Sequence, residues 1–312
     1  MIKRIMLIIA IIYSFIGCEE NVVYKSGFNE IPALYCVINA DSSNQYAMLT
    51  NNYSEKDEAG NNYIKDANIQ ITVNNESVEF KDSSTTKNNV ETDFYYVNGF
   101  KPKLGSEIEI KAELTDGRSL SSSLAIPKFS LFVFEKSFVT IPSSQDPSRL
   151  YVGWTLRNSS DNLSFLTRLT INYSVNKNGI ETKHDYPIPI EYVISNNNKL
   201  PVYPQAARTS FQVYPQSIIS TAFSEISVGD TNKSSYTILN ANFEVFIMEE
   251  NLTNYSASIE SFNNSYSVKV YEPQISNING GLGVFGAYVK RSMDVFVEPE
   301  FIESFGYNYL GR

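Results

Sequence analysis

The sequence predicts an all-β protein, with an N-terminal immunoglobulin- or fibronectin-like sandwich followed by a second β-rich, sandwich-like domain that contains one short helix. Apolar and polar residues alternate in short segments at the period of a β-strand. Turn residues separate these segments at intervals of about 8–12 residues, as in sandwich folds. The chain of 312 residues also contains 21 Tyr and 19 Phe, whose rings pack well on pleated sheets. Apolar residues make up 42% of the chain, enough to bury a core.

The first residues predict a secretory signal that ends at a lipoprotein cleavage site. A short basic start precedes the uncharged run 5–16. This run is shorter than the roughly 20 residues that a membrane-spanning helix needs, so it is typical of a signal peptide. Segment 15–18 (FIGC) resembles the bacterial lipobox, with Phe15 in place of the usual leucine. We therefore expect residues 1–17 to be removed and a lipid to be attached to Cys18.

The residues after Cys18 indicate where the lipid anchor is held. Each buried CH₂ of an acyl chain contributes about 0.8 kcal/mol, so several chains make a stable anchor. Glu19 and Glu20 follow directly, and they resemble the signal that exports lipoproteins of the Bacteroidota to the outer face of the outer membrane. In other bacteria an acidic second residue can mean retention at the inner membrane. We expect an outer-membrane lipoprotein exposed at the cell surface on a polar tether, residues 18–30.

Residues 31–128 are predicted to form the first sandwich. Strands are expected at 33–39, 45–50, 69–73, 78–80, 94–97, 108–114 and in a return segment that ends at Ile126. Ile69 and Ile71 alternate with polar residues, which is typical of a half-buried strand. Asp116-Gly117 is a hairpin turn signal. The paired cysteines of antibody domains are absent, so only the broader sandwich class is expected.

A boundary is expected at residues 127–130, and residues 129–312 are predicted to form the second domain. Its strands are expected at 131–134, 138–141, 150–156, 169–175, 243–248, 268–271, 284–289 and 293–297. Asn178-Gly179 is the strongest hairpin signal in the chain. Segment 203–214 contains proline and is interpreted as a loop or an edge strand. Apolar residues at helical spacing between 252 and 262, after a possible cap at Asn251, predict the single short helix.

A glycine-rich block near the C-terminus carries a family resemblance. Residues 277–287 (NINGGLGVFGA) resemble the C-terminal signature of an uncharacterised Bacteroidota lipoprotein family, domain-of-unknown-function family 4249. The lipobox and the early segment 35–39 are compatible with this family. No enzymatic reaction is known for this family. Its members often look like partners of TonB-dependent outer-membrane receptors, so the resemblance implies such a receptor as the partner of this chain.

The same block contains a literal G-x-G-x-x-G between Gly281 and Gly286. A dinucleotide site needs this motif between a strand and a helix of a βαβ unit. Here the strand-like segment 287–289 follows, close to the C-terminus, so we do not expect a nucleotide site. The glycines of the block Gly280–Gly286 are instead expected to permit positive φ angles or a close approach of two backbones. A loop that faces a ligand or a partner is the alternative.

No catalytic, cofactor or metal residues are predicted. His184 is the only histidine, and its neighbour Asp185 is expected on the opposite face of a strand, so neither a triad nor a metal site follows. Cys36 lies in an apolar run and is expected to be a buried free thiol, because the other cysteine is acylated. Trp154 is expected in the core rather than in a sugar-binding platform. Segment 57–62 lacks the alternating oxygen ligands of a calcium loop.

Charge and motif content narrow the function. The formal net charge is −9, and an acidic surface repels phosphates, which excludes nucleic-acid binding. The chain lacks G-x-S-x-G, H-E-x-x-H and C-x-x-C, which disfavours serine hydrolases, zinc proteases and dithiol redox proteins. We expect a non-enzymatic surface lipoprotein that assists a TonB-dependent receptor in uptake or recognition. A stand-alone glycan- or protein-binding adhesin is the alternative, and a hydrolase with paired carboxylates is a weaker one.

Overall fold

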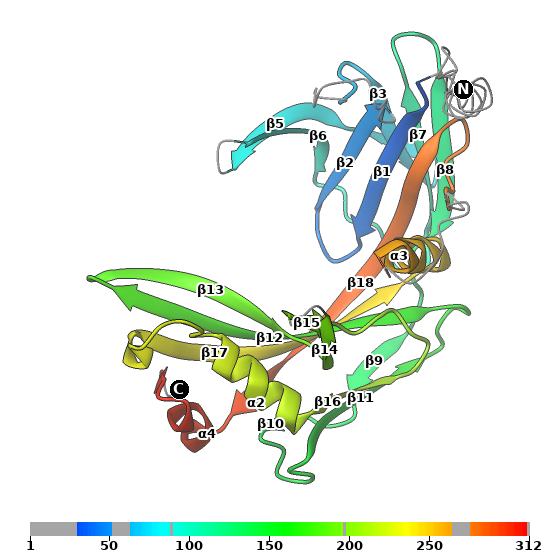
Figure 1. The fold of residues 1–312 in the computed structure, drawn as a ribbon. Coiled ribbons are helices and arrows are strands. Elements are labelled where there is room, and N and C mark those ends of the chain that lie inside the picture. Colours follow the sequence, from blue (N-terminus) through cyan, green and yellow to red (C-terminus); the bar gives the residue numbers. More distant parts are fainter. Residues whose placement is uncertain (1–29, 52–62, 88–89, 196–197, 264–274, 311–312) are drawn as a thin grey trace, which may run out of the picture. The chain divides into compact units, whose positions relative to one another are not determined.

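The computed structural model in Figure 1 describes residues 30–51, 63–87, 90–195, 198–263 and 275–310. The predictions for the leader, for lipidated Cys18, for the tether up to residue 29, for segment 57–62 and for a strand at 268–271 lie outside these residues. Strands dominate the described chain, and the predicted all-β sandwich class is confirmed.

The N-terminal part is a sandwich of two sheets that enclose a common core. The strands of one sheet are β1 (Pro32–Asn39), β2 (Asn44–Asn51), β6 (Val90–Asn98) and β5 (Lys81–Lys87). The strands of the other are β4 (Glu76–Glu79), β3 (Asn68–Val73), β7 (Glu107–Glu113) and β8 (Ser119–Ala125). Every second residue points inward, so Leu34, Ile69 and Ile110 are fully buried. This alternation is the pattern that predicted the sandwich.

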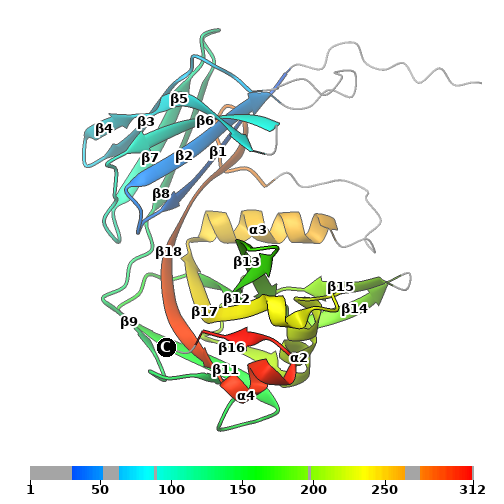
Figure 2. The ribbon, with the colours of Figure 1, turned by 90° about the vertical axis from the view of Figure 1, so that its left-hand side faces the viewer.

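One long strand, β18 (Leu282–Val297), joins this sandwich to the later part of the chain (Figure 2). Its first half pairs in parallel with β1, and its second half pairs antiparallel with β17 (Tyr236–Met248). A single sheet therefore runs in the order β13-β12-β17-β18-β1-β2-β6-β5. The boundary expected at residues 127–130 stays a prediction, but this sheet contains strands from both sides of it.

The later part adds strands to the large sheet and packs a small sheet against it. The added strands are β12 (Ser164–Lys177) and β13 (Ile180–Ile188), and β10 (Thr140–Ile141) and β19 (Asn308–Tyr309) pair with β18 and β17. The small sheet has the order β16 (Phe211–Pro215), β11 (Arg149–Arg157) and β9 (Leu131–Phe134). A separate hairpin consists of β14 (Glu191–Ser195) and β15 (Asn198–Val202). Asn178 and Gly179 adopt positive φ angles of 56° and 81° between β12 and β13, so the predicted hairpin is confirmed.

The predicted short helix is confirmed as α3 (Glu250–Asn263), but its cap is different. The side chain of Glu249 accepts hydrogen bonds from the first turn, so the cap is not Asn251. In the part of the chain that the structure describes, two further helices were not predicted, α2 (Gln216–Glu225) and α4 (Pro299–Ser304), and a short 3₁₀ turn η1 spans Lys233–Ser235. Segment 216–225 is rich in isoleucine, serine and threonine, which have low helix propensity, and this masks the helical spacing of its buried residues.

Candidate functional site

The glycine-rich block is a place of close backbone contact, as predicted. Gly283 has a φ of +111°, and a Cβ on it would lie 2.0 Å from the carbonyl oxygen of Leu34 in β1. A Cβ on Gly281 would lie 2.3 Å from the carbonyl oxygen of Pro32. Only glycine fits at such distances. The block pairs with a strand instead of opening a βαβ unit, so it lacks the context of a nucleotide site.

Gly286 allows helix α3 to rest on the sheet. A Cβ on Gly286 would lie 2.9 Å from the Cβ of Leu252 in α3. The carboxylate of Glu249, which is 8% exposed, accepts the N–H groups of Asn251 and Leu252 at 2.7 Å each. It also accepts the N–H of Ala287 in β18 at 3.3 Å, which ties the start of the helix to the sheet. Burial raises the pKa of Glu249, and these backbone hydrogen bonds offset only part of the rise.

A groove of about 620 Å³ lies beside α3 on the outward face of the large sheet. Leu166 is the register partner of Phe246, and Met248 is the partner of Tyr288, so these side chains share that face. Six side chains from β1, β12, β17, β18 and α3 supply most of the apolar wall: Val37, Leu166, Phe246, Met248, Leu252 and Tyr288. A volume of this size is typical of small-molecule sites.

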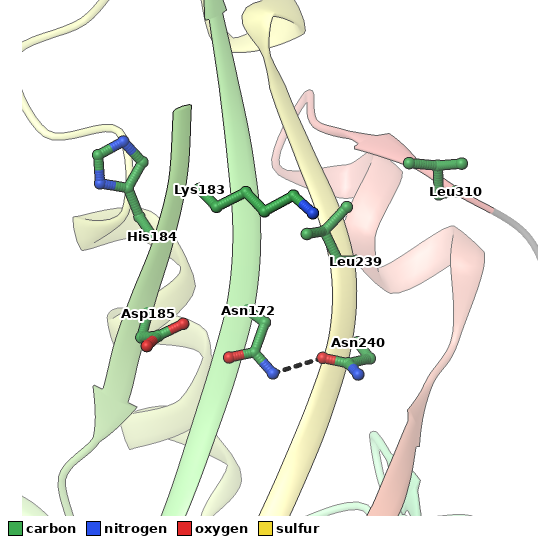
Figure 3. A pocket seen from close by; sticks show the side chains of 7 residues that line it. All are labelled: Asn172, Lys183, His184, Asp185, Leu239, Asn240 and Leu310. Carbon is green, nitrogen blue, oxygen red and sulfur yellow. Dashed lines mark hydrogen bonds between the residues drawn. The ribbon is translucent and has the colours of Figure 1, made fainter. Parts of the chain in front are cut away.

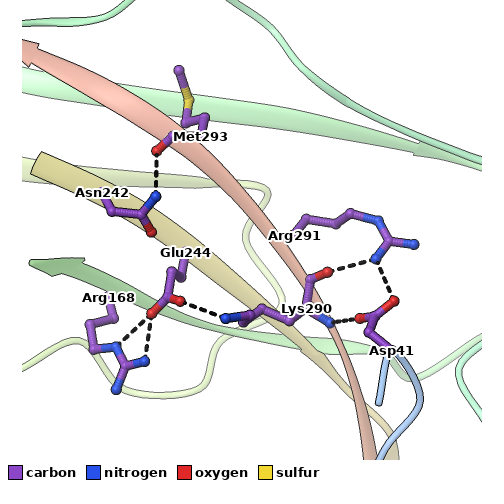
Figure 4. A network of polar contacts seen from close by, with 7 residues as sticks. All are labelled: Asp41, Arg168, Asn242, Glu244, Lys290, Arg291 and Met293. Atoms are coloured by element: carbon purple, nitrogen blue, oxygen red, sulfur yellow. Dashed lines mark hydrogen bonds and ion pairs between the residues drawn. The ribbon is translucent and has the colours of Figure 1, made fainter. Parts of the chain in front are cut away.

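Arg168 lines the groove and belongs to the charged network drawn in Figure 4. Lys290 of this network is the register partner of Phe246, which also lines the groove. Glu244 is 9% exposed, and its carboxylate accepts hydrogen bonds from the Nε of Arg168 at 2.8 Å and from the Nζ of Lys290 at 2.9 Å. Burial by itself would raise the pKa of Glu244, but the hydrogen bonds and charges of the two cations outweigh it and hold the pKa below its usual range. The guanidinium of Arg168 also lies over the ring of Phe246, 5.2 Å from its centre.

Asp41 extends this network from the turn after β1. Its carboxylate accepts the backbone N–H of Lys290 at 2.7 Å and the Nη1 of Arg291 at 3.1 Å. The network drawn in Figure 4 therefore contains three cations, Arg168, Lys290 and Arg291, and the two carboxylates of Asp41 and Glu244. It is locally positive by one charge, whereas the whole chain carries −9.

Next to the groove, the outward side of β1, β2 and β6 carries large apolar side chains that are exposed or half-buried. We call this surface the apolar face; it consists of Tyr35, Val37, Tyr46, Met48, Phe94 and Tyr96. Tyr46 is 55% exposed, Met48 39% and Val37 37%. Val37 also lines the groove, so the two features are continuous. Exposed apolar surface of this kind marks interaction sites.

Sequence reasoning missed both the groove and the apolar face. A sandwich strand with one face in solvent alternates apolar and polar residues. The segment Phe94-Tyr95-Tyr96-Val97 has large apolar residues at every position, so both of its faces are apolar. Tyr95 and Val97 are buried in the core, which leaves Phe94 and Tyr96 on the outer side. Segments 33–38 and 46–49 are apolar at every position in the same way, so such runs were the local signal of the apolar face.

A second pocket, of about 440 Å³, surrounds the predicted pair His184 and Asp185 (Figure 3). Both residues are exposed on strand β13, and their side chains point in different directions. The His184 ring stacks on Tyr173 at a centroid distance of 5.4 Å, and its Nε2 lies 2.8 Å from the hydroxyl of Thr182. The prediction that this pair lies exposed on a strand is confirmed.

The remaining predicted residues lie in the core. Cys36 is a free thiol that is 1% exposed, and burial raises its pKa, which makes it unreactive. Trp154 is 1% exposed and packs against Phe165 and Phe243 at centroid distances of 5.5 and 6.2 Å. Within the described residues no three His, Cys, Asp or Glu side chains gather as a metal site. Among those same residues no helix has the length and apolar content to cross a membrane.

Comparison with known proteins finds no matching family model and no matching curated protein. The solved structures that are similar in part include the following two. The three-domain immunoglobulin ectodomain of mouse nectin-like molecule 4 has 9% identity and a TM-score of 0.19, with 86% of this chain and 65% of that chain covered. A pullulanase from Anoxybacillus, complexed with maltotriose, has 7% identity and a TM-score of 0.20, with 70% and 24% covered. The chain thus spans less than two thirds of either one, and such TM-scores support no argument about its function.

Proposed function

We propose that this chain is a non-enzymatic binding protein of the cell surface, anchored in the outer membrane by lipid on Cys18, that docks a TonB-dependent receptor through the apolar face. The observation that carries the proposal is the exposure of Tyr46, Met48 and Val37 on neighbouring strands of one sheet. These side chains lie outside the buried core of the sandwich, which is on the opposite side of the strands. A partner that covers these side chains removes their apolar surface from water, and this burial stabilises the complex.

The geometry of the rings favours a protein partner over a glycan. Tyr46 and Phe94 lie 5.7 Å apart at an interplanar angle of 63°, and Phe94 and Tyr96 lie 6.3 Å apart at 57°. Rings that are tilted in this way present edges as well as faces, whereas a sugar ring stacks on an open flat face. Tyrosine, phenylalanine and methionine are enriched at the buried centres of protein interfaces. The composition of the face matches such a centre.

The expected anchor explains why the partner should be a membrane protein. The tether of residues 18–30 extends to at most roughly 45 Å. A lipid on Cys18 therefore keeps the apolar face close to proteins of the same membrane and raises their effective concentration. A weak docking surface is then sufficient. The resemblance of residues 277–287 to the receptor-associated lipoprotein family makes a TonB-dependent receptor the specific expectation.

The test compares two matched double variants of the lipidated protein in detergent extracts of its own outer membrane. Tyr46→Ser with Met48→Ser alters the apolar face, and Leu131→Ser with Val133→Ser alters an equally exposed pair, 43% and 47%, on β9. We expect a TonB-dependent receptor, identified by mass spectrometry, to co-purify with the wild type and the β9 variant and to be lost from the first variant.

Two results would contradict the proposal. Retention of the receptor by the Tyr46→Ser, Met48→Ser protein would show that docking occurs elsewhere. A wild-type protein that retains no receptor, together with glycan binding by its mature chain alone, would favour the adhesin. Circular dichroism of both double variants controls for folding, because all four positions are solvent-exposed and their substitution should leave the core intact.

A further inference from the structure

We propose that the groove beside α3 binds a single-chain amphiphile, with its acyl chain along the apolar wall and its carboxylate against the cations of Arg168 and Lys290. The groove shares Val37 with the apolar face, but this proposal does not depend on the docking role of that face. The groove is large enough, at about 620 Å³, and it lies on the described outward side of β12, β17 and β18.

The wall of the groove selects an apolar chain. The wall includes the flexible apolar side chains of Leu166 in β12, Met248 in β17 and Leu252 in α3. Hydroxyl groups come only from Thr167, Ser256 and the two tyrosines of the lining. A polyhydroxylated ligand such as a glycan would leave most of its hydroxyls without partners against this wall, which is costly. An alkyl chain has no such requirement, and each CH₂ that it buries tightens binding about fourfold.

The rim of the groove selects a negative head group. Arg168 and Lys290 share the single carboxylate of Glu244. Asp41 is already engaged by Arg291 and by a backbone N–H. One further carboxylate would balance the network. A guanidinium carries five N–H donors, and Glu244 engages only Nε and Nη2 of Arg168, whose side chain remains 53% exposed.

The test measures binding of three probes by isothermal titration below their micellar concentrations: dodecanoate, tetradecanoate and dodecanol. The protein is the chain from Glu19 onward, which carries no lipid of its own. Residues 31–52 and 61–312 form one compact unit without the first thirty residues, so this chain keeps the groove. We expect binding of one molecule, with tetradecanoate about 15-fold tighter than dodecanoate from its two additional CH₂ groups.

The head-group contact is tested with Arg168→Gln and its control Arg157→Gln, an exposed arginine on β11. Dodecanoate should bind the wild type and the control about tenfold tighter than dodecanol, and this preference should disappear in Arg168→Gln. A second variant, Ser256→Phe, fills the groove from helix α3 and should abolish binding of all three probes. Circular dichroism verifies that each variant is folded.

Each other outcome overturns the proposal. Equal binding of dodecanoate and dodecanol to the wild type would remove the carboxylate contact. Unchanged binding by Ser256→Phe would place the amphiphile outside the groove. No binding of any probe would leave the groove to a different occupant, such as an apolar peptide segment of a partner protein.

Discussion

Substitution of Gly283 by alanine should strongly destabilise the fold. The new Cβ would lie 2.0 Å from the carbonyl oxygen of Leu34 and 2.7 Å from its carbonyl carbon. Both are backbone atoms of β1, so no side chain can rotate away, and β1 and β18 have to separate. The φ of +111° costs an alanine roughly 1–3 kcal/mol by itself. With disruption of the strand pairing, we expect a total loss of at least about 4 kcal/mol, against the 5–15 kcal/mol that is usual for a domain.

The matched control is Gly179→Ala. Gly179 also has a positive φ, +81°, but a Cβ there would meet no atom within 4 Å. The control therefore carries only the conformational cost, about 1 kcal/mol. Urea unfolding followed by circular dichroism measures both variants against the wild type. If the two free energies of unfolding differ by less than about 1 kcal/mol, the close approach of Gly283 to β1 does not stabilise the sheet, and the architectural role assigned to the glycine block is wrong.

Three other predictions concern titratable groups. The pKa of Glu244 is lowered, so its ion pairs stabilise the fold above the unfolded pKa, and this stabilisation is lost as pH falls through the folded pKa. When the urea midpoint of unfolding is measured from about pH 3 to 7, Glu244→Gln should therefore reduce the fall of the midpoint at acidic pH. The pKa of Glu249 is raised, so the stability that its protonation contributes is fully present below the unfolded pKa and is lost as pH rises through the folded pKa. Glu249→Gln should reduce this loss of stability in the same measurement. An unchanged dependence of the urea midpoint on pH would contradict the raised pKa of Glu249. The Cys36 thiol should resist a disulfide reagent in the native protein and react fully in urea, and rapid native labelling would contradict its burial.

Local signals in the sequence predicted the elements that local chemistry determines. Asn178-Gly179 forms the hairpin turn because both residues accept positive φ angles. The apolar residues between 252 and 262 predicted α3 by their helical spacing, although the cap at Glu249 was not recognised, because glutamate is an uncommon N-cap. Strand β5 was not predicted, since its polar sequence (KDSSTTK) carries no apolar alternation.

The pairing of β1 with β18 had no signature in the sequence. Ala33 pairs with Leu282, and the two residues are separated by most of the chain. Parallel neighbours that are distant in sequence depend on the complete tertiary arrangement, whereas a hairpin depends on its turn. The groove and the apolar face share this origin. Their side chains come from several strands and one helix, so their proximity follows from the order of strands in the large sheet.

The packing of the glycine block also determines where a ligand or partner can bind. Gly281 and Gly283 lie against backbone atoms of β1, and Gly286 lies under Leu252 of α3. These backbone surfaces are therefore already covered, and the block itself offers no open loop to a ligand. Its effect on function is indirect: it brings β1, β18 and α3 close enough to build the groove and to continue it into the apolar face. The glycine block of this chain is thus a sheet junction, and recognition should depend on the exposed side chains beside it, such as Tyr46 and Arg168.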